Sequence, residues 1–112
     1  MSDCLFCKII KKEIKSKIEY EDDEVVAIQD INPQAPVHIL VMPKRHIESI
    51  SVMQEPDAAL VGEVIYKARQ IAKQRGWEHY RLVFNNGAES GQSVFHIHLH
   101  LLSGRRMHWP PG

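Results

Sequence analysis

Three histidines alternate with apolar residues in the segment 95–102, which reads Phe-His-Ile-His-Leu-His-Leu-Leu. Because every second side chain of a β-strand projects from the same face, this alternation predicts a strand with His96, His98 and His100 on one face. The intervening apolar side chains are expected to face a core: Ile97, Leu99 and Leu101. Histidine titrates near neutral pH and serves as base, acid, nucleophile or metal ligand, so the histidine face is the candidate functional site.

The spacing of the three rings limits their chemistry. Neighbouring rings on one strand face lie roughly 6.6 Å apart, at about 3.3 Å per residue, and His96 lies roughly twice as far from His100. A tetrahedral zinc ion with Zn–N bonds of about 2.0–2.1 Å accepts two such neighbours, but not all three from a regular strand. The row therefore fits an extended substrate better than one metal centre. The alternative is a half-buried strand whose polar residues simply face solvent.

Length and charge narrow the class of protein. At 112 residues, the chain is expected to form one domain, residues 1–112. Lys and Arg together number 14, as do Asp and Glu, so net charge gives no reason to expect binding to nucleic acid or to a membrane surface. Apolar runs are a few residues long, well short of a bilayer span. Residues 1–4 show no signal-peptide pattern, so a cytoplasmic location is expected.

The order of predicted elements indicates the fold class. A short helix is expected over residues 5–12, and apolar residues at helical spacing predict one long helix from Pro56 to just before Gly76. Strands are expected at 17–20, 25–29, 37–42, 80–85 and 95–102. Since the strands come in runs and do not alternate with helices, the sequence predicts an α+β fold with an antiparallel sheet.

A polar loop leads into the histidine strand. Gly91-Gln92-Ser93-Val94 offers a glycine backbone, an amide and a hydroxyl, and Asn85 at the end of the preceding strand offers another amide. Such donors suit the oxygens of a phosphate group. Each of these residues alone is more typical of a turn, but their place at one end of the histidine row makes phosphate binding as good an interpretation as a turn.

Among the three histidines, His98 is the best candidate for a nucleophile because it has a ring on either side. A histidine can attack phosphorus directly and so divide one difficult displacement into two easier ones through a covalent intermediate. A nucleophilic ring has to be neutral, which near pH 7 needs little change from the usual pKa of about 6.5. A hydroxyl such as that of Ser93 could help to protonate the leaving group.

These residues carry a resemblance to a known family. The run His-Ile-His-Leu-His-Leu-Leu at 96–102 resembles the His-φ-His-φ-His-φ-φ motif (φ, apolar) of the histidine triad (HIT) superfamily. Four more stretches are similar to its Hint branch, the histidine triad nucleotide-binding proteins: 30–36 (Asp-Ile-Asn-Pro-Gln-Ala-Pro), 43–46 (Pro-Lys-Arg-His), 91–94, and 104–112 with its final Trp-Pro-Pro-Gly. The resemblance covers residues 6–112.

The resemblance implies a HIT-like fold and a homodimer whose two sheets join into one. It implies hydrolysis of purine nucleoside phosphoramidates such as adenosine 5′-phosphoramidate, or of aminoacyl adenylates, with no metal needed for the displacement. His98 is implied as the nucleophile that forms a nucleotidyl-histidine, and His96 as the residue that orients it. It further implies that Asp30 binds the ribose and that Ile31 contacts the purine. Trp109 is implied to approach the active site of a second subunit. The residues implied to hold the phosphate or the leaving group are His100, Ser93, Gln92 and Asn85.

Three rival functions remain open. One is another reaction of the same superfamily, the hydrolysis of dinucleoside polyphosphates, although the Trp-Pro-Pro end favours the Hint branch. The second is a nucleotide-binding regulatory module with little turnover of its own. The third is a zinc-dependent protein in which His46 and His96 act mainly as ligands.

The two cysteines form a Cys-x-x-Cys pair, Cys4 and Cys7, which can hold zinc if two further ligands are available. His46 and His96 are the candidate partners, an arrangement that some bacterial family members resemble, and such a zinc would be structural. The alternatives are two small apolar residues on a short helix, or a redox pair. His38 and His79 fall outside the pattern, and the sequence assigns them no role.

Overall fold

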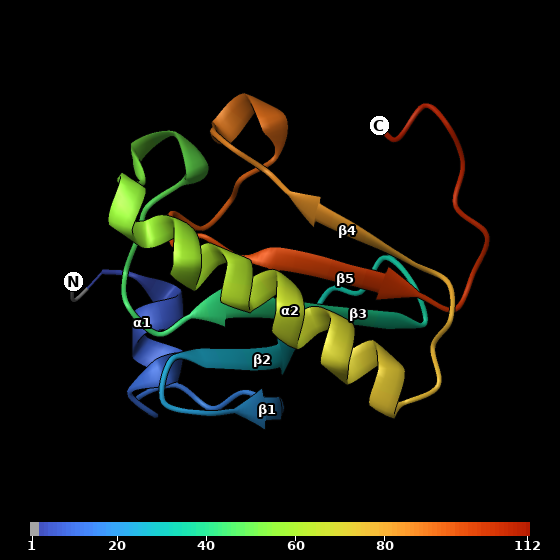
Figure 1. Ribbon diagram of the computed structural model, residues 1–112, viewed down its shortest axis with the longest axis horizontal. Helices are drawn as coiled ribbons and strands as arrows, with labels where there is room; N and C mark the ends of the chain where they lie inside the picture. Colours follow the sequence, from blue (N-terminus) through green and yellow to red (C-terminus); the bar gives the residue numbers. More distant parts are fainter. Residues whose placement is uncertain (1–2) are drawn as a thin grey trace.

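The computed structural model describes residues 3–112, so Met1 and Ser2 lie outside the described residues. These two residues belong to the segment 1–4, in which no signal peptide is expected. Figure 1 shows one twisted sheet with helices on both of its faces. The elements in chain order are α1 (Leu5–Ile10), β1 (Ile18–Glu21), β2 (Val25–Gln29), β3 (Val37–Pro43), α2 (Ala58–Gln74), β4 (Tyr80–Phe84) and β5 (Leu99–Ser103). Short 3-10 turns lie at Ile50–Val52, Glu55–Asp57 and Ala88–Ser90.

The five strands form a single sheet in the order β1-β2-β3-β5-β4, and every neighbouring pair is antiparallel. The predicted α+β class, with an antiparallel sheet, one long helix and a short N-terminal helix, is therefore confirmed. Among the described residues, no helix has the length and apolar character needed to cross a bilayer.

Alternating side chains divide the sheet into two buried faces. On β2, Val25 and Ala27 pack toward α2, whereas Val26 and Ile28 pack toward α1. Nearly all of β2 and β3 is consequently buried, because each face of these two central strands has a helix above it. The histidine rings lie on the α1 face, where Phe6 of α1 meets the rings of His96 and His98 edge-on.

The long helix begins and ends by recognisable signals. Pro56 lies in a 3-10 turn in which Gln54 and Asp57 form a reciprocal capping box, so the α-helical part starts two residues later than predicted. At the other end, Gly76 has a φ of 76°, and the Trp77 N–H returns to the Ala72 carbonyl at 2.9 Å. The predicted glycine stop is therefore confirmed.

The predicted histidine strand is shorter than expected, and this part of the prediction is wrong. β5 begins only at Leu99, so His96 and His98 precede the strand and only His100 lies in it. Continuing the register of β5 against β3 would place Ile97 opposite Pro43. Pro43 has no N–H to donate to a ladder, and its carbonyl accepts a hydrogen bond from the His96 ring at 2.7 Å instead. The apolar side chains nevertheless enter the core as predicted: Ile97, Leu99 and Leu101.

Replacing Gly104 with alanine is expected to destabilise the fold. Gly104 directly follows β5 with a φ of 97°, and an added Cβ would lie 2.8 Å from the Cβ of Pro36. The left-handed backbone alone costs about 1–3 kcal/mol for another residue, and the close contact adds to it. Urea denaturation would measure the loss. The matched control is Gly62→Ala in the middle of α2, where the added methyl meets nothing within 4 Å and should stabilise by up to about 1 kcal/mol. A Gly104→Ala protein as stable as the parent would contradict this account.

Candidate active site and metal centre

His98 is held with one ring nitrogen aimed away from the backbone. Its Nδ1–H donates to the carbonyl of His96 at 2.8 Å, which places the proton on Nδ1 and leaves the lone pair on Nε2. Phe6 packs edge-on against the ring with 4.9 Å between centroids, and the side chain is 6% exposed. The backbone contact and the packing against Phe6 together therefore fix the ring and leave its Nε2 free of the His96 carbonyl.

A cavity of about 220 Å³ opens onto this ring. One part of its wall is apolar, from α1 and β2, and includes Phe6, Ile9 and Ile28. The other part is mainly polar. The cavity wall contains five of the site residues predicted from the sequence: Asp30, Ile31 at its rim, Ser93, His98 and His100. The structure thus brings the loop after β2, the loop before β5 and the triad to one pocket.

Two of the predicted phosphate contacts do not line this cavity. The side chain of Gln92 is buried, accepts a hydrogen bond from the Gly87 N–H at 2.8 Å and donates to the carbonyls of Glu48 and Val94. Asn85 lies against Gly91, because a Cβ added to that glycine would be 3.5 Å from the Asn85 Nδ2. Both side chains in this structure support the loop that carries Ser93.

Sequence analysis missed a fourth histidine. His38 of β3 lies diagonal to His100 of β5, since Leu40 is directly opposite His100 in the ladder. The His38 Nε2 lies 2.9 Å from the His100 Nδ1 and 3.3 Å from a carboxylate oxygen of Asp30. Only the strand register reveals this contact, because nothing in the spacing of His38 along the chain connects it with the triad.

Burial keeps the site histidines neutral. It lowers the pKa of His100 to about 4, and the neighbouring rings of His98 and His38 lower it further. Burial also lowers the pKa of His98, although the hydrogen bond to the His96 carbonyl and the charge of Asp30 oppose this change. At pH 7 both rings are consequently uncharged, which is the form that can attack phosphorus or donate from one defined nitrogen.

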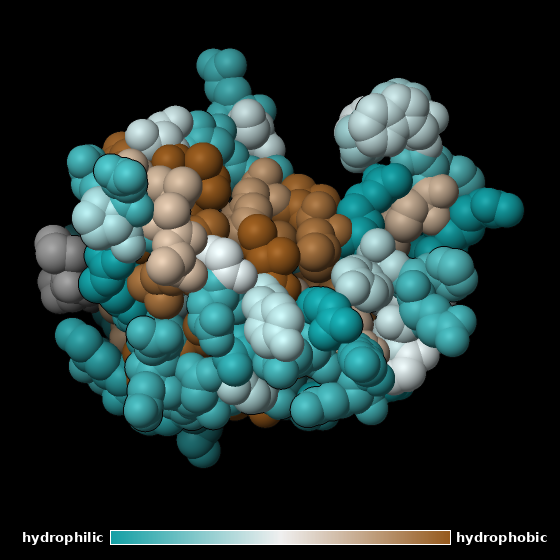
Figure 2. Space-filling model, viewed as in Figure 1, coloured by the Kyte–Doolittle hydropathy of each residue, from teal (hydrophilic) through white to brown (hydrophobic). Residues whose placement is uncertain are grey.

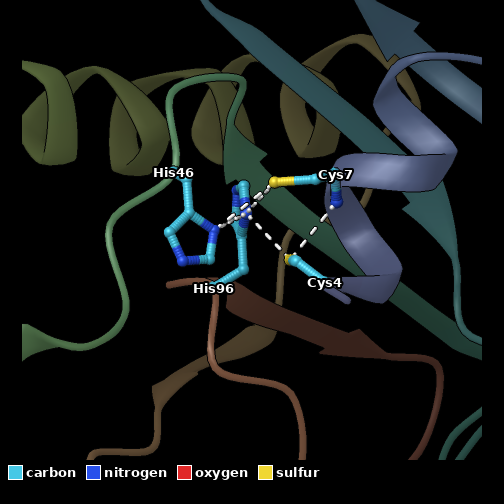
Figure 3. Close-up of side chains that lie close together, drawn as sticks. All are labelled: Cys4, Cys7, His46 and His96. Carbon is cyan, nitrogen blue, oxygen red and sulfur yellow. Dashed lines mark hydrogen bonds between the residues drawn. The ribbon is translucent and has the colours of Figure 1, made fainter. Parts of the chain in front are cut away.

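A second cluster lies on the other side of His96. Figure 3 shows Cys4, the N-cap of α1, and Cys7, within α1, facing His46 and His96. All four ligand-type atoms lie within 4.8 Å of one another. The His96 Nδ1 lies 3.5 Å from the Cys4 sulfur and 3.6 Å from the Cys7 sulfur. The His46 Nδ1 lies 3.4 Å from the Cys7 sulfur and 3.2 Å from the His96 Nδ1. The structure therefore brings together all four residues of the predicted metal set.

The spacing of these atoms fits a tetrahedral zinc ion. With bonds of about 2.3 Å to sulfur and about 2.05 Å to nitrogen, S···N distances are about 3.6 Å and N···N distances about 3.3 Å. The His96 Nε2 lies 2.7 Å from the Pro43 carbonyl and must donate to it, so the Nδ1 lone pair points into the cluster. Burial lowers the pKa of His96 to about 4 and so keeps the ring in its ligand form. Burial also raises the pKa of the Cys7 thiol, a cost that a bound cation would offset.

Comparison with known proteins agrees with this geometry. Residues 3–108 match the family model described as scavenger mRNA decapping enzyme C-term binding. A HIT family hydrolase from Legionella pneumophila superposes with a TM-score of 0.95 and is 46% identical, over 98% of this chain and all of that one. The chain belongs to the HIT family. The family indicated by the triad motif is therefore confirmed, together with its fold.

Two plant relatives of this HIT chain carry informative names. The 14 kDa zinc-binding protein of Zea mays is 50% identical, over 99% of this chain and 89% of its own length. Adenylylsulfatase HINT1 of Arabidopsis thaliana is 47% identical, over 99% of this chain and 78% of its own length. One name refers to a metal and the other to a reaction at an adenylyl group.

Proposed function

We propose that this HIT protein hydrolyses purine nucleoside 5′-phosphoramidates, or aminoacyl adenylates, through a covalent nucleotidyl-His98. The observation that carries the proposal is the fixed orientation of His98, whose Nδ1 is engaged by the His96 carbonyl and whose ring lines a pocket. Solved relatives named as hydrolases and the plant adenylylsulfatase support the reaction class. The choice of a P–N substrate rests on the resemblance to the Hint branch.

The pocket offers separate surfaces for the three parts of a nucleotide. Apolar side chains of α1 and β2 suit a purine, and Ile31, 97% exposed at the rim, is available to cover the base. The Asp30 carboxylate suits ribose hydroxyls, because a charged acceptor makes strong hydrogen bonds with such donors. His98, His100 and Ser93 then surround the phosphate.

The proposed reaction proceeds in two displacements. The His98 Nε2 forms a bond to phosphorus while the P–N bond breaks, and the amine departs with that electron pair and a proton passed from solvent through the exposed Ser93 hydroxyl. Water then attacks the nucleotidyl-histidine, which releases the nucleoside monophosphate and restores the neutral ring. Each displacement uses groups of this chain and water, and we place no metal ion in either.

Incubation with adenosine 5′-phosphoramidate is expected to release AMP catalytically. A panel with the same adenylyl group and a different leaving group tests the substrate class: adenylyl sulfate, aminoacyl adenylate and a dinucleoside polyphosphate. Release should be fastest from the P–N compound. Faster release from the dinucleoside polyphosphate would favour that rival reaction, and tight AMP binding with no turnover of any compound would favour the regulatory module.

We propose that the protein works as a homodimer whose sheets join. β4 is an edge strand with Leu82 partly exposed, and Figure 2 shows apolar surface beside α2 in this region. An open hollow of about 790 Å³ lies between β4 and the C-terminal segment, where Arg81, Arg105 and Arg106 line it. Trp109 is 83% exposed in the single chain, which agrees with a place against a second subunit.

We propose that the Cys/His cluster binds one structural zinc ion. Its ligands are Cys4, Cys7, His46 and His96, whose donor spacing supports a tetrahedral ion. When bound, zinc supplies four bonds that fasten α1 to the loop after β3 and to the segment before β5. With four protein ligands the ion keeps no open position, which is typical of structural and not of catalytic sites.

A further inference from the structure

The stretch 93–96, which runs from Ser93 to the first histidine of the triad, has little backbone hydrogen bonding of its own. It lies outside the helices and strands, between the turn at Ala88–Ser90 and the start of β5. Among the described residues, none of its four N–H groups donates to a backbone carbonyl. Because the stretch is not part of a ladder or a helix, its position beside the pocket depends on side chains and on the contacts at its two ends.

Both ends of this stretch are fastened to the loop after β3. At one end, the Ile97 N–H donates to the Ile47 carbonyl at 2.7 Å. At the other end, the Gln92 Nε2 donates to the carbonyl of Glu48, the next residue of that loop, at 2.7 Å. The backbone that carries Ser93 is therefore held between two neighbouring residues of one loop, and one of the two contacts is made by a side-chain amide.

The Gln92 amide also reaches the residue on the far side of Ser93. Its Nε2 donates to the Val94 carbonyl at 3.2 Å, and its Oε1 accepts from the Gly87 N–H at 2.8 Å. The Gly87 carbonyl in turn accepts from the Gln92 N–H at 3.1 Å, which closes the turn 87–92. The Gln92 side chain is 3% exposed, so water does not readily replace these contacts. One buried amide thus holds the chain on both sides of Ser93.

Ser93 is the residue of this stretch whose hydroxyl meets the pocket. Its side chain is exposed and lines the cavity together with His98 and His100. The hydroxyl of a serine is one rotatable bond away from the backbone, so the place of the Ser93 Oγ is set by where the backbone is held. A displacement of about 1 Å at a reacting centre can cost about 100-fold in rate. The contacts of Gln92 therefore govern the reach of this hydroxyl.

We propose that Gln92 is a positioning residue that acts through Ser93 and holds its hydroxyl where the departing amine takes the proton. As the P–N bond breaks, the Ser93 O–H gives its proton to that nitrogen and regains one from water. The role rests on the proposed hydrolysis, and it differs from the phosphate contact expected for Gln92 from the sequence. It matters for an amine, which departs poorly without a proton, and not for sulfate, which departs as a stable anion.

Gln92→Met tests this role because it keeps the length of the side chain but removes its hydrogen bonds. In single turnovers, cleavage of adenosine 5′-phosphoramidate should slow by about 10- to 100-fold, the effect of a displaced general acid. Cleavage of adenylyl sulfate should stay within a few-fold of the parent rate, which also shows that the variant is folded. Gln92→Glu keeps the shape and the acceptor for the Gly87 N–H, and should show the same selectivity if Gln92→Met does not fold. The matched control is Gln74→Met at the exposed end of α2, which should cleave both compounds at the parent rates.

A double-mutant cycle with Ser93→Ala shows whether the two residues act together. Ser93→Ala should slow cleavage of the phosphoramidate selectively, and adding Gln92→Met to it should change the rate by less than about two-fold. Equal slowing of both compounds in the folded Gln92 variants, or multiplied losses in the double variant, would overturn the proposal and leave Gln92 with a packing role. A parent protein that cleaves neither compound would instead refute the proposed hydrolysis, and this role with it.

Discussion

Replacing His98 with alanine is expected to lower the turnover of adenosine 5′-phosphoramidate by about 10⁴-fold or more, the scale seen when a nucleophile is removed. The effect should be large because the variant has no nitrogen at the position of Nε2, and the preceding triad ring, His96, is engaged elsewhere. His96 has its Nε2 on the Pro43 carbonyl and its Nδ1 in the Cys/His cluster. Steady-state release of AMP measures the loss.

The matched control for that variant is His79→Ala, which removes an exposed histidine outside the cluster. It should turn over substrate at the parent rate. The His98→Ala protein loses the contact of the ring with Phe6, so its fold is checked by circular dichroism and by binding of AMP. A folded His98→Ala protein that still hydrolyses the phosphoramidate at a rate near that of the parent would refute the assignment of the nucleophile.

Zinc is expected to stabilise metal-stripped protein strongly. A ligand at about 100 times its dissociation constant stabilises a fold by about 2.7 kcal/mol. For a domain of this size that corresponds to a rise in Tm of about 10 °C. The four ligands come from three separate segments, so the ion should oppose their separation on unfolding. Thermal unfolding with and without zinc measures the rise, and elemental analysis should find one zinc per chain.

Cys4→Ser is the discriminating variant for the metal site. Cys4 is the N-cap of α1 and its sulfur accepts a hydrogen bond from the Cys7 N–H, a role that serine performs at least as well. The substitution therefore removes a thiolate ligand without removing the cap. The variant should fold but lose most of the rise in Tm. A rise as large as that of the parent would show that zinc binds somewhere else.

Much of this fold could be predicted from the sequence because its local signals agree. The apolar spacing of α2, its glycine stop and the short runs of β-branched and aliphatic residues in β2 and β3 agree with one another on the fold. The functional pocket could be predicted in part for the same reason, since the triad and the loop before it are adjacent in the chain. Two further residues of the pocket, Asp30 and Ile31, were inferred only from the family resemblance.

What could not be predicted depends on strand register and on proline chemistry. The position of His38 beside His100 follows from the pairing of β3 with β5, which no short segment encodes. The late start of β5 follows from Pro43 in the facing strand, more than fifty residues away in the sequence. Likewise, Gln92 looked like a free phosphate donor until its contacts with Gly87, Glu48 and Val94 were known.

The most direct test of the central proposal is the mass of the protein during turnover. The parent protein is mixed with adenosine 5′-phosphoramidate, denatured in alkali within milliseconds to seconds, digested and sequenced by tandem mass spectrometry. Covalent catalysis predicts a fraction of the chain heavier by one adenylyl group, with that group on His98. The absence of any adduct at all times during active turnover, or an adduct on a different residue, would contradict it.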